Sequence, residues 1–176
     1  TDNFFRVRIL IASMLALTAE ALGAFVGVLL VHFPLQSIIL SAIILLPAAA
    51  WFSTLLTILR TQGRYLFCSI STVLVLLAMI TTGISVSGGP AVSPVTQLLV
   101  IPPLTAYFFG GIRWGSYTIA IAFGVLLLLI GLQLGGIEFI QTVEDVDRRI
   151  ALQFLVSFVG LSVISGMAFI YEYTAA

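Results

Sequence analysis

The sequence has no lysine and few charged residues of any kind. Its seven cationic side chains are all arginines, and with seven acidic residues they make up only 8% of 176 residues. A soluble domain carries about 25% charged residues. This shortage excludes a water-soluble globular domain. The formal net charge of zero also excludes the basic surface that nucleic acid requires of a partner.

Cysteine and histidine each occur once, as Cys68 and His32. A single thiol excludes an internal disulfide, and one thiol with one imidazole is too few for the usual Cys/His metal sites. The sequence also lacks paired carboxylates, a phosphate-binding loop and a nucleophile elbow. We therefore predict no catalytic residue, no metal and no cofactor, and we do not expect this chain to be an enzyme by itself.

The sequence consists mainly of long apolar runs. Hydrophobic residues make up 61% of it, and the mean hydropathy is +1.23. Proline, glycine and charged residues divide it into six runs, most of them near the roughly 20 residues that cross hydrocarbon. The predicted spans run from about Val7 to Val31, Leu35 to Leu59, Tyr65 to Val86, Val95 to Phe109, Trp114 to Leu134 and Ile150 to Tyr173. We predict a single all-α domain over residues 1–176, a polytopic membrane protein with six transmembrane helices. Pro102-Pro103 interrupts the short fourth run, so the fourth helix is expected to be kinked.

The arginines predict the orientation of these spans. If all six runs cross, one side carries Arg6, Arg8, Arg60, Arg64 and Arg113, and the other carries Arg148 and Arg149. Cytoplasmic loops are enriched in arginine and lysine. Both termini are therefore expected in the cytoplasm.

A carboxylate in the middle of the first run is the most unusual polar group. Glu20 would lie near the bilayer centre, where an ionised side chain costs at least about 2.5 kcal/mol. Gly23 and Gly27 form a GxxxG pair on its helix face, so Glu20 is expected to point into protein rather than lipid. Three interpretations stay open: a protonated carboxyl hydrogen-bonded inside the bundle, a ligand or ion contact in a pocket, and a contact between two copies.

Other polar residues gather in the predicted outer half of the membrane. With Glu20, the candidate ligand-binding residues are Thr82, Ser85, Gln97, Pro102 and Gln133. One interpretation is a shallow pocket that opens outward. The other is that each polar group satisfies its own backbone or a neighbouring helix, as serine and threonine do routinely.

Small, turn-forming residues mark the middle of the chain. Ser87-Gly88-Gly89 is followed by Ser93-Pro94, then by Pro102-Pro103 and by residues 110–115, which read GGIRWG. An outer hairpin between two helices is sufficient to explain this run. The pattern also resembles the six-helix N-terminal membrane domains of bacterial signalling proteins, in which a (T/S)GG-x-x-(S/N)P loop joins the third and fourth spans.

The resemblance implies a function. Such domains precede GGDEF diguanylate cyclases, sensor histidine kinases and some class III adenylate cyclases. This chain would then be a fragment that lies in the bacterial inner membrane, forms a parallel homodimer and is followed by a cytoplasmic output domain, a diguanylate cyclase before the other two. Tyr171 and Glu172, in the last helix, would transmit the signal.

Two functions of different classes, and a structural role, follow from these observations. The first is a sensory input domain that binds an apolar or amphipathic ligand, or reads the state of the lipid bilayer. The alternative is a small stand-alone transporter or channel that uses Glu20. A structural membrane scaffold is the third.

Overall fold

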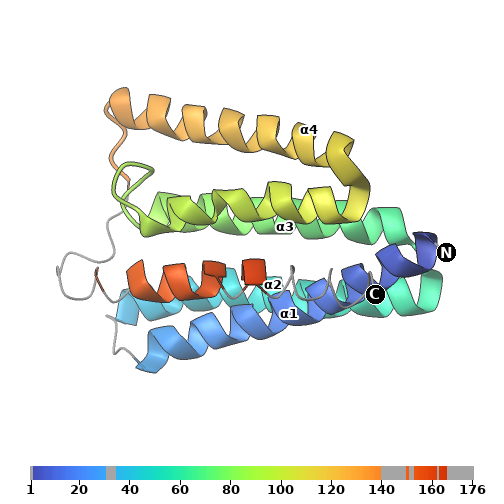
Figure 1. Ribbon diagram of the computed structural model, residues 1–176. Coiled ribbons are helices and arrows are strands. Elements are labelled where there is room, and N and C mark those ends of the chain that lie inside the picture. The colour runs from blue at the N-terminus through green and yellow to red at the C-terminus, as the bar shows by residue number, and fades with distance from the viewer. Residues whose placement is uncertain (1, 31–34, 140–149, 151–152, 162, 166–176) are drawn as a thin grey trace.

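The computed structural model describes residues 2–30, 35–139, 150, 153–161 and 163–165 of the 176 residues. Helix dominates these residues, and no strand occurs among them. The prediction of an all-α fold is confirmed. Figure 1 shows the helices lying side by side as one elongated bundle.

Among the described residues, four apolar helical stretches are long enough to cross a membrane, which supports the membrane class. Helix α1 (Asp2–Leu30), α2 (Leu35–Gln62) and α3 (Tyr65–Val86) coincide with the first three predicted spans. The fourth stretch, Pro94–Leu134, joins a 3-10 helix, η1 (Pro94–Val100), to α4 (Ile101–Leu134). A shorter helix follows at residues 153–161 and 163–165, here called the C-terminal segment.

Helix α4 contains residues from both the fourth and the fifth predicted spans. Its backbone leaves the helical region at Gly111, where φ is 76° and ψ is −169°, so two helical parts meet there at a kink. The two parts face each other, because Leu104 and Tyr107 of the first and Ile119 of the second line one apolar groove. The turn between them lies at the end of the bundle where α1 begins (Figure 1). The count of six transmembrane spans stays a prediction.

The kink predicted at Pro102-Pro103 is not confirmed. Both prolines stand in the first turn of α4, directly after η1, and both are buried. Proline is accepted in a first helical turn because its missing N–H would have no partner in the helix there. The change from 3-10 to α-helix takes place just before the prolines, and the break inside α4 is made by glycine.

The core lies between α1, α2, α3 and the start of α4. Its largest fully buried side chains include Leu10, Met14, Phe52, Leu55 and Phe109. Large apolar side chains also cover the outside of the bundle, such as Leu15, Ile43, Leu74 and Phe123. A soluble monomer rarely exposes so much contiguous apolar surface, whereas lipid accommodates it.

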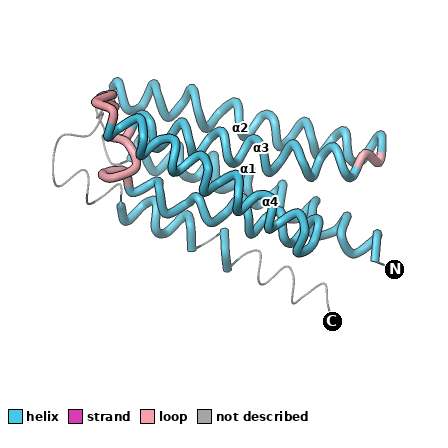
Figure 2. The backbone as a smooth tube through the Cα atoms, turned by 90° about the horizontal axis from the view of Figure 1, so that it is seen from above, coloured by secondary structure: helices cyan, strands magenta, loops and turns pink. Residues whose placement is uncertain are grey.

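The connections gather at the two ends of the bundle, as Figures 1 and 2 show. The start of α1, the α2–α3 connection and the Gly111 turn share one end, and these are the places where Arg8, Arg64 and Arg113 stand. The loop at residues 87–93 and the end of α4 share the other. The structure therefore gathers at one end the described arginines that the sequence places on one side.

Candidate functional site

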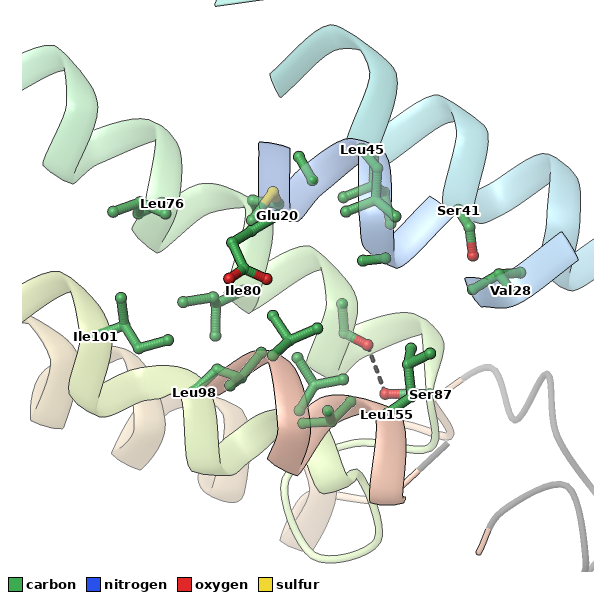
Figure 3. Close-up of a pocket in the computed structure, with 18 of the residues that line it drawn as sticks. Glu20, Val28, Ser41, Leu45, Leu76, Ile80, Ser87, Leu98, Ile101 and Leu155 are labelled. Atoms are coloured by element: carbon green, nitrogen blue, oxygen red, sulfur yellow. Dashed lines mark hydrogen bonds between the residues drawn. The ribbon is translucent and has the colours of Figure 1, made fainter. Parts of the chain in front are cut away.

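A partly open cavity of about 190 Å³ lies between the helices of the bundle. Its walls come from five parts of the chain: α1, α2, α3, the segment from Ser87 through η1 to Ile101, and the C-terminal segment. The site is therefore a product of tertiary packing. Figure 3 shows the side chains that surround it.

Helix α1 contributes the ionisable group of this cavity. Leu17, Glu20, Ala21, Ala24 and Val28 all line it, because residues three and four apart fall on one helix face. The two alanines leave space beside the carboxylate that larger side chains would fill. Glu20 lies within about 3 Å of the middle of the Val7–Leu30 span at 1.5 Å per residue.

The carboxylate of Glu20 points into the cavity toward Ile80 (Figure 3). Within the part of the chain that the structure describes, it has no hydrogen bond and no ion pair. The side chains that surround it are almost all apolar, including Leu76, Leu98 and Ile101. The carboxylate is thus the one charged group in the described lining, and its hydrogen-bonding capacity is unused.

Polarity changes along the cavity. Ser41 and Ser87 lie toward one end, Leu76 and Ile101 lie toward the other, and Glu20 lies between them (Figure 3). The serine end is the end of the bundle that carries the loop at residues 87–93. A molecule in the cavity would therefore meet hydroxyl groups near that loop and hydrocarbon beyond Glu20.

The loop at residues 87–93 is fixed by hydrogen bonds at the serine end. The Ser87 hydroxyl donates to the Gly83 carbonyl at 2.5 Å and also contacts the Ser93 hydroxyl, while Ser93 accepts from the Val95 N–H at 3.2 Å and so caps η1. Gly88 and Gly89 have φ of 102° and 80°, which glycine adopts at no steric cost. The turn predicted for this run is confirmed.

The end of α4 packs against the same loop. The Gln133 side-chain oxygen accepts a hydrogen bond from the Ala91 N–H at 3.4 Å. A Cβ atom added to Gly89 would lie 2.6 Å from Cδ2 of Phe139, so any larger residue would have to displace that ring. Residues far apart in the sequence thus hold the loop beside the cavity.

Of the six predicted ligand-binding residues, only Glu20 lines the cavity. Thr82 and Ser85 donate to the carbonyls of Ala78 and Thr81 at 2.8 and 3.0 Å, as expected if each hydroxyl satisfies its own helix. Gln97 is exposed, Pro102 is buried at the start of α4, and Gln133 holds the loop. The structure does not bring these five into the cavity. Tyr171 and Glu172 lie outside the described residues.

Sequence reasoning missed most of the lining. Ser41 of α2 belongs to the polar residues of the predicted outer half, and it does line the cavity. Ser37, Ile44 and Leu45 line it too but were not predicted, and the i, i+4 spacing of Ser37 and Ser41 was the available signal. Gly27 was correctly placed on a close-packing face, because a Cβ atom there would lie 2.5 Å from Cδ1 of Leu155. A Cβ atom added to Gly23 would meet no neighbouring atom within 4 Å, so Gly23 does not pack closely against another helix as Gly27 does.

The described lining of the cavity offers one carboxylate and three serine hydroxyl groups as polar side-chain groups. Among the described residues, no group of three or more histidine, cysteine, aspartate or glutamate side chains could hold a metal ion. One carboxylate among hydrocarbon side chains can accept hydrogen bonds or pair with a cation. Scans of the chain against protein-family models, curated proteins and solved structures give no match.

Proposed function

We propose that this chain is a membrane-embedded sensory domain that binds a small apolar or amphipathic ligand in the Glu20 cavity. The observation that supports this function best is that Glu20 and the C-terminal segment line the same cavity. A ligand held there touches the helix that leads toward the C-terminus. Binding and transmission then share one surface.

The C-terminal segment presents a regular face to the cavity. Leu155, Val159 and Val163 are spaced four residues apart and all line it. The segment also approaches η1 closely, because a Cβ atom added to Gly160 would lie 3.0 Å from Cδ2 of Leu98. A ligand shifts an equilibrium between two positions of this helix only if it binds one of them more tightly. Direct contact with three of its side chains supplies such a difference.

In the membrane, the chain then has one orientation and acts on a cytoplasmic output domain. The end of the bundle that carries Arg8, Arg64 and Arg113 faces the cytoplasm, both termini lie there, and all six predicted spans cross a bacterial inner membrane. The last helix continues into a cytoplasmic output domain, a diguanylate cyclase before a histidine kinase or an adenylate cyclase. Two copies act as a parallel dimer through their last helices.

Distance measurements between spin labels test this function. Cys68 is first replaced by serine. Thr54 of α2 and Phe158 of the C-terminal segment, which are both exposed, are then replaced by cysteines that carry the spin labels. The distance distribution is recorded in lipid nanodiscs with and without toluene, an apolar molecule of the size of the cavity. We expect toluene to shift the distribution, and we expect no shift when Ala24→Phe fills the cavity. An unchanged distribution in the chain without Ala24→Phe would reject the proposal.

A transporter or channel is the second candidate, and the unpaired Glu20 carboxylate near mid-span is the observation that favours it. Intramembrane carboxylates often mark ion or proton paths. Against it, Glu20 is the sole ionisable group in the described cavity lining, and relays need successive groups. Flux of protons or cations into liposomes decides the matter, because a flux that Glu20→Gln leaves unchanged removes this function.

A further inference from the structure

We propose that the ligand of the Glu20 cavity is a small amphipathic amine whose N–H groups pair with the Glu20 carboxylate and whose apolar body fills the rest of the cavity. This inference rests on the proposed function and specifies its ligand class. On α1, the Glu20 carboxylate faces a cavity whose other described lining residues are apolar apart from three serines.

The unused carboxylate sets the polar group of the ligand. Glu20 has no hydrogen bond or ion pair among the described residues, although the cavity beside it has room for another molecule. An ionised carboxylate only accepts hydrogen bonds, so the complementary group is a donor, and an ammonium ion adds charge pairing at low dielectric. An acidic ligand would be repelled, because no arginine or histidine lines the described cavity. A bare metal ion would lack the additional oxygen or nitrogen ligands that it needs.

The volume sets the size of the ligand. An apolar cavity of about 150 Å³ holds one benzene molecule, and the present cavity is about 190 Å³. One ring, or an equally short alkyl chain, with a one-carbon arm and an amine therefore fits, which is about seven to nine non-hydrogen atoms. A whole phospholipid does not fit this volume.

The gradient of polarity sets the direction in which the ligand lies. With its nitrogen at Glu20, the apolar body can extend between Ile80 and Leu98 toward Ile101, away from Ser41 and Ser87. Val163 of the C-terminal segment lines the cavity and belongs to the same core cluster as Leu76 and Ile101, and Val159 packs against that cluster. The apolar body of the ligand thus contacts the helix that the proposed function uses for transmission.

Three fluorinated probes that share one ring separate this ligand class from its competitors. 4-Fluorobenzylamine carries the amine, 4-fluorotoluene carries no polar group, and 4-fluoroacetophenone carries an acceptor that would suit a protonated carboxyl. Their binding to the chain in nanodiscs is followed by the fluorine NMR signal of the bound probe. Ala24→Phe, which fills the cavity, identifies the part of each signal that comes from this site.

We expect the amine to bind roughly ten- to a hundred-fold more tightly than the toluene, because a hydrogen bond to a charged group contributes that range of affinity. Glu20→Gln should reduce amine binding by the same factor and leave 4-fluorotoluene unchanged. The matched variant Glu138→Gln, which changes an exposed carboxylate outside the cavity, should leave all three probes unchanged.

The outcomes separate this inference from the proposed function. If 4-fluorotoluene or 4-fluoroacetophenone binds as tightly as the amine, the ligand class is wrong although the cavity still binds ligands. If no probe binds, both proposals fail. The ratio of amine to toluene affinity in the chain without substitutions decides the class even if Glu20→Gln does not fold, and circular dichroism of each variant reports whether its helices are intact.

Discussion

The Glu20 carboxylate is expected to lower the stability of the chain while providing the polar group for ligand binding. Its carboxylate stands near the middle of the α1 span and faces a largely apolar cavity without a described partner. Such a group is expensive in the membrane, and the chain would gain stability by losing it. A binding role explains its presence, since a ligand that supplies the missing donor offsets the cost only when it is bound.

Glu20→Leu should therefore raise the free energy of unfolding in the absence of added ligand by about 2 kcal/mol. The substitution removes a desolvated carboxylate and places hydrocarbon in a hydrocarbon-lined cavity. Thermal or denaturant unfolding of the chain in detergent, followed by circular dichroism, measures the change. Glu138→Leu, at an exposed carboxylate, should change stability by no more than about 0.5 kcal/mol. A less stable Glu20→Leu variant would mean that the carboxylate already has a stabilising partner.

Two interpretations were open for the outer polar residues, and the structure supports backbone satisfaction for Thr82 and Ser85. Each donates to a backbone carbonyl four residues earlier in its own helix. Gln133 does make a tertiary contact, although with the loop at Ala91 rather than with the cavity. Glu20 differed because a carboxylate has no donor and cannot be satisfied by backbone carbonyls.

At the scale of elements, the sequence predicts helices where their ends are marked. The break at Gly111 falls between the fourth and the fifth predicted spans, whereas the kink predicted at Pro102-Pro103 is not confirmed. The ends of α2 and α3 coincide with Arg60 to Arg64 and with the run after Val86, where charge and turn-forming residues end an apolar pattern. Pro102-Pro103 predicted a kink because proline removes a backbone donor. The two prolines instead begin α4, a position where that loss has no consequence.

Gly111 should be the least replaceable glycine of α4. Its φ of 76° with ψ of −169° is a backbone conformation that is essentially restricted to glycine. Gly111→Ala should therefore reduce the free energy of unfolding by about 1–3 kcal/mol, even though nothing lies within 4 Å of the added Cβ atom. Unfolding of the purified variant in detergent measures this loss.

Gly124 provides the matched control, because it lies in the helical second part of α4 and also has open space around its Cβ position. Gly124→Ala should stabilise the chain by about 0.5–1 kcal/mol, since alanine loses less backbone entropy in a helix. The two substitutions thus differ in sign although both add the same methyl group. Equal effects would show that the conformation at Gly111 is not what separates the two parts of α4.

At the scale of the whole molecule, the cavity exists because five parts of the chain leave one space between them. Its lining combines Ala24 of α1, Ser41 of α2, Gly83 of α3, Leu98 of η1 and Val159 of the C-terminal segment. The periodicity of apolar residues predicts which residues lie on the inner face of each helix, but it does not indicate which helices are neighbours. The order of packing decides where small residues coincide, and that information lies in tertiary contacts alone.

The arrangement of the ends predicts a labelling pattern for the whole chain in its membrane. The α2–α3 connection, which holds Gly63, and the Gly111 turn, which Arg113 follows, lie at the arginine-rich end of the bundle (Figure 1). The loop that holds Ala91 and the end of α4, which Gly136 follows, lie at the opposite end. Single cysteines at these four positions, in a Cys68→Ser background, are treated with a membrane-impermeant maleimide added from outside intact cells or after lysis. We expect cysteines at 91 and 136 to react from outside and those at 63 and 113 to react only after lysis.

The cysteine at position 113 tests whether the two parts of α4 cross the membrane separately. If the two parts of α4 cross the membrane separately, the Gly111 turn is a cytoplasmic loop, and exposed Arg113 becomes accessible once the cell is opened. If α4 crosses once as a single long helix, position 113 lies within the bilayer and stays unlabelled on both sides. Labelling at 113 only after lysis would establish that the fourth and fifth predicted spans are separate crossings. Labelling from outside would reverse the proposed orientation and move the serine end of the cavity to the cytoplasm.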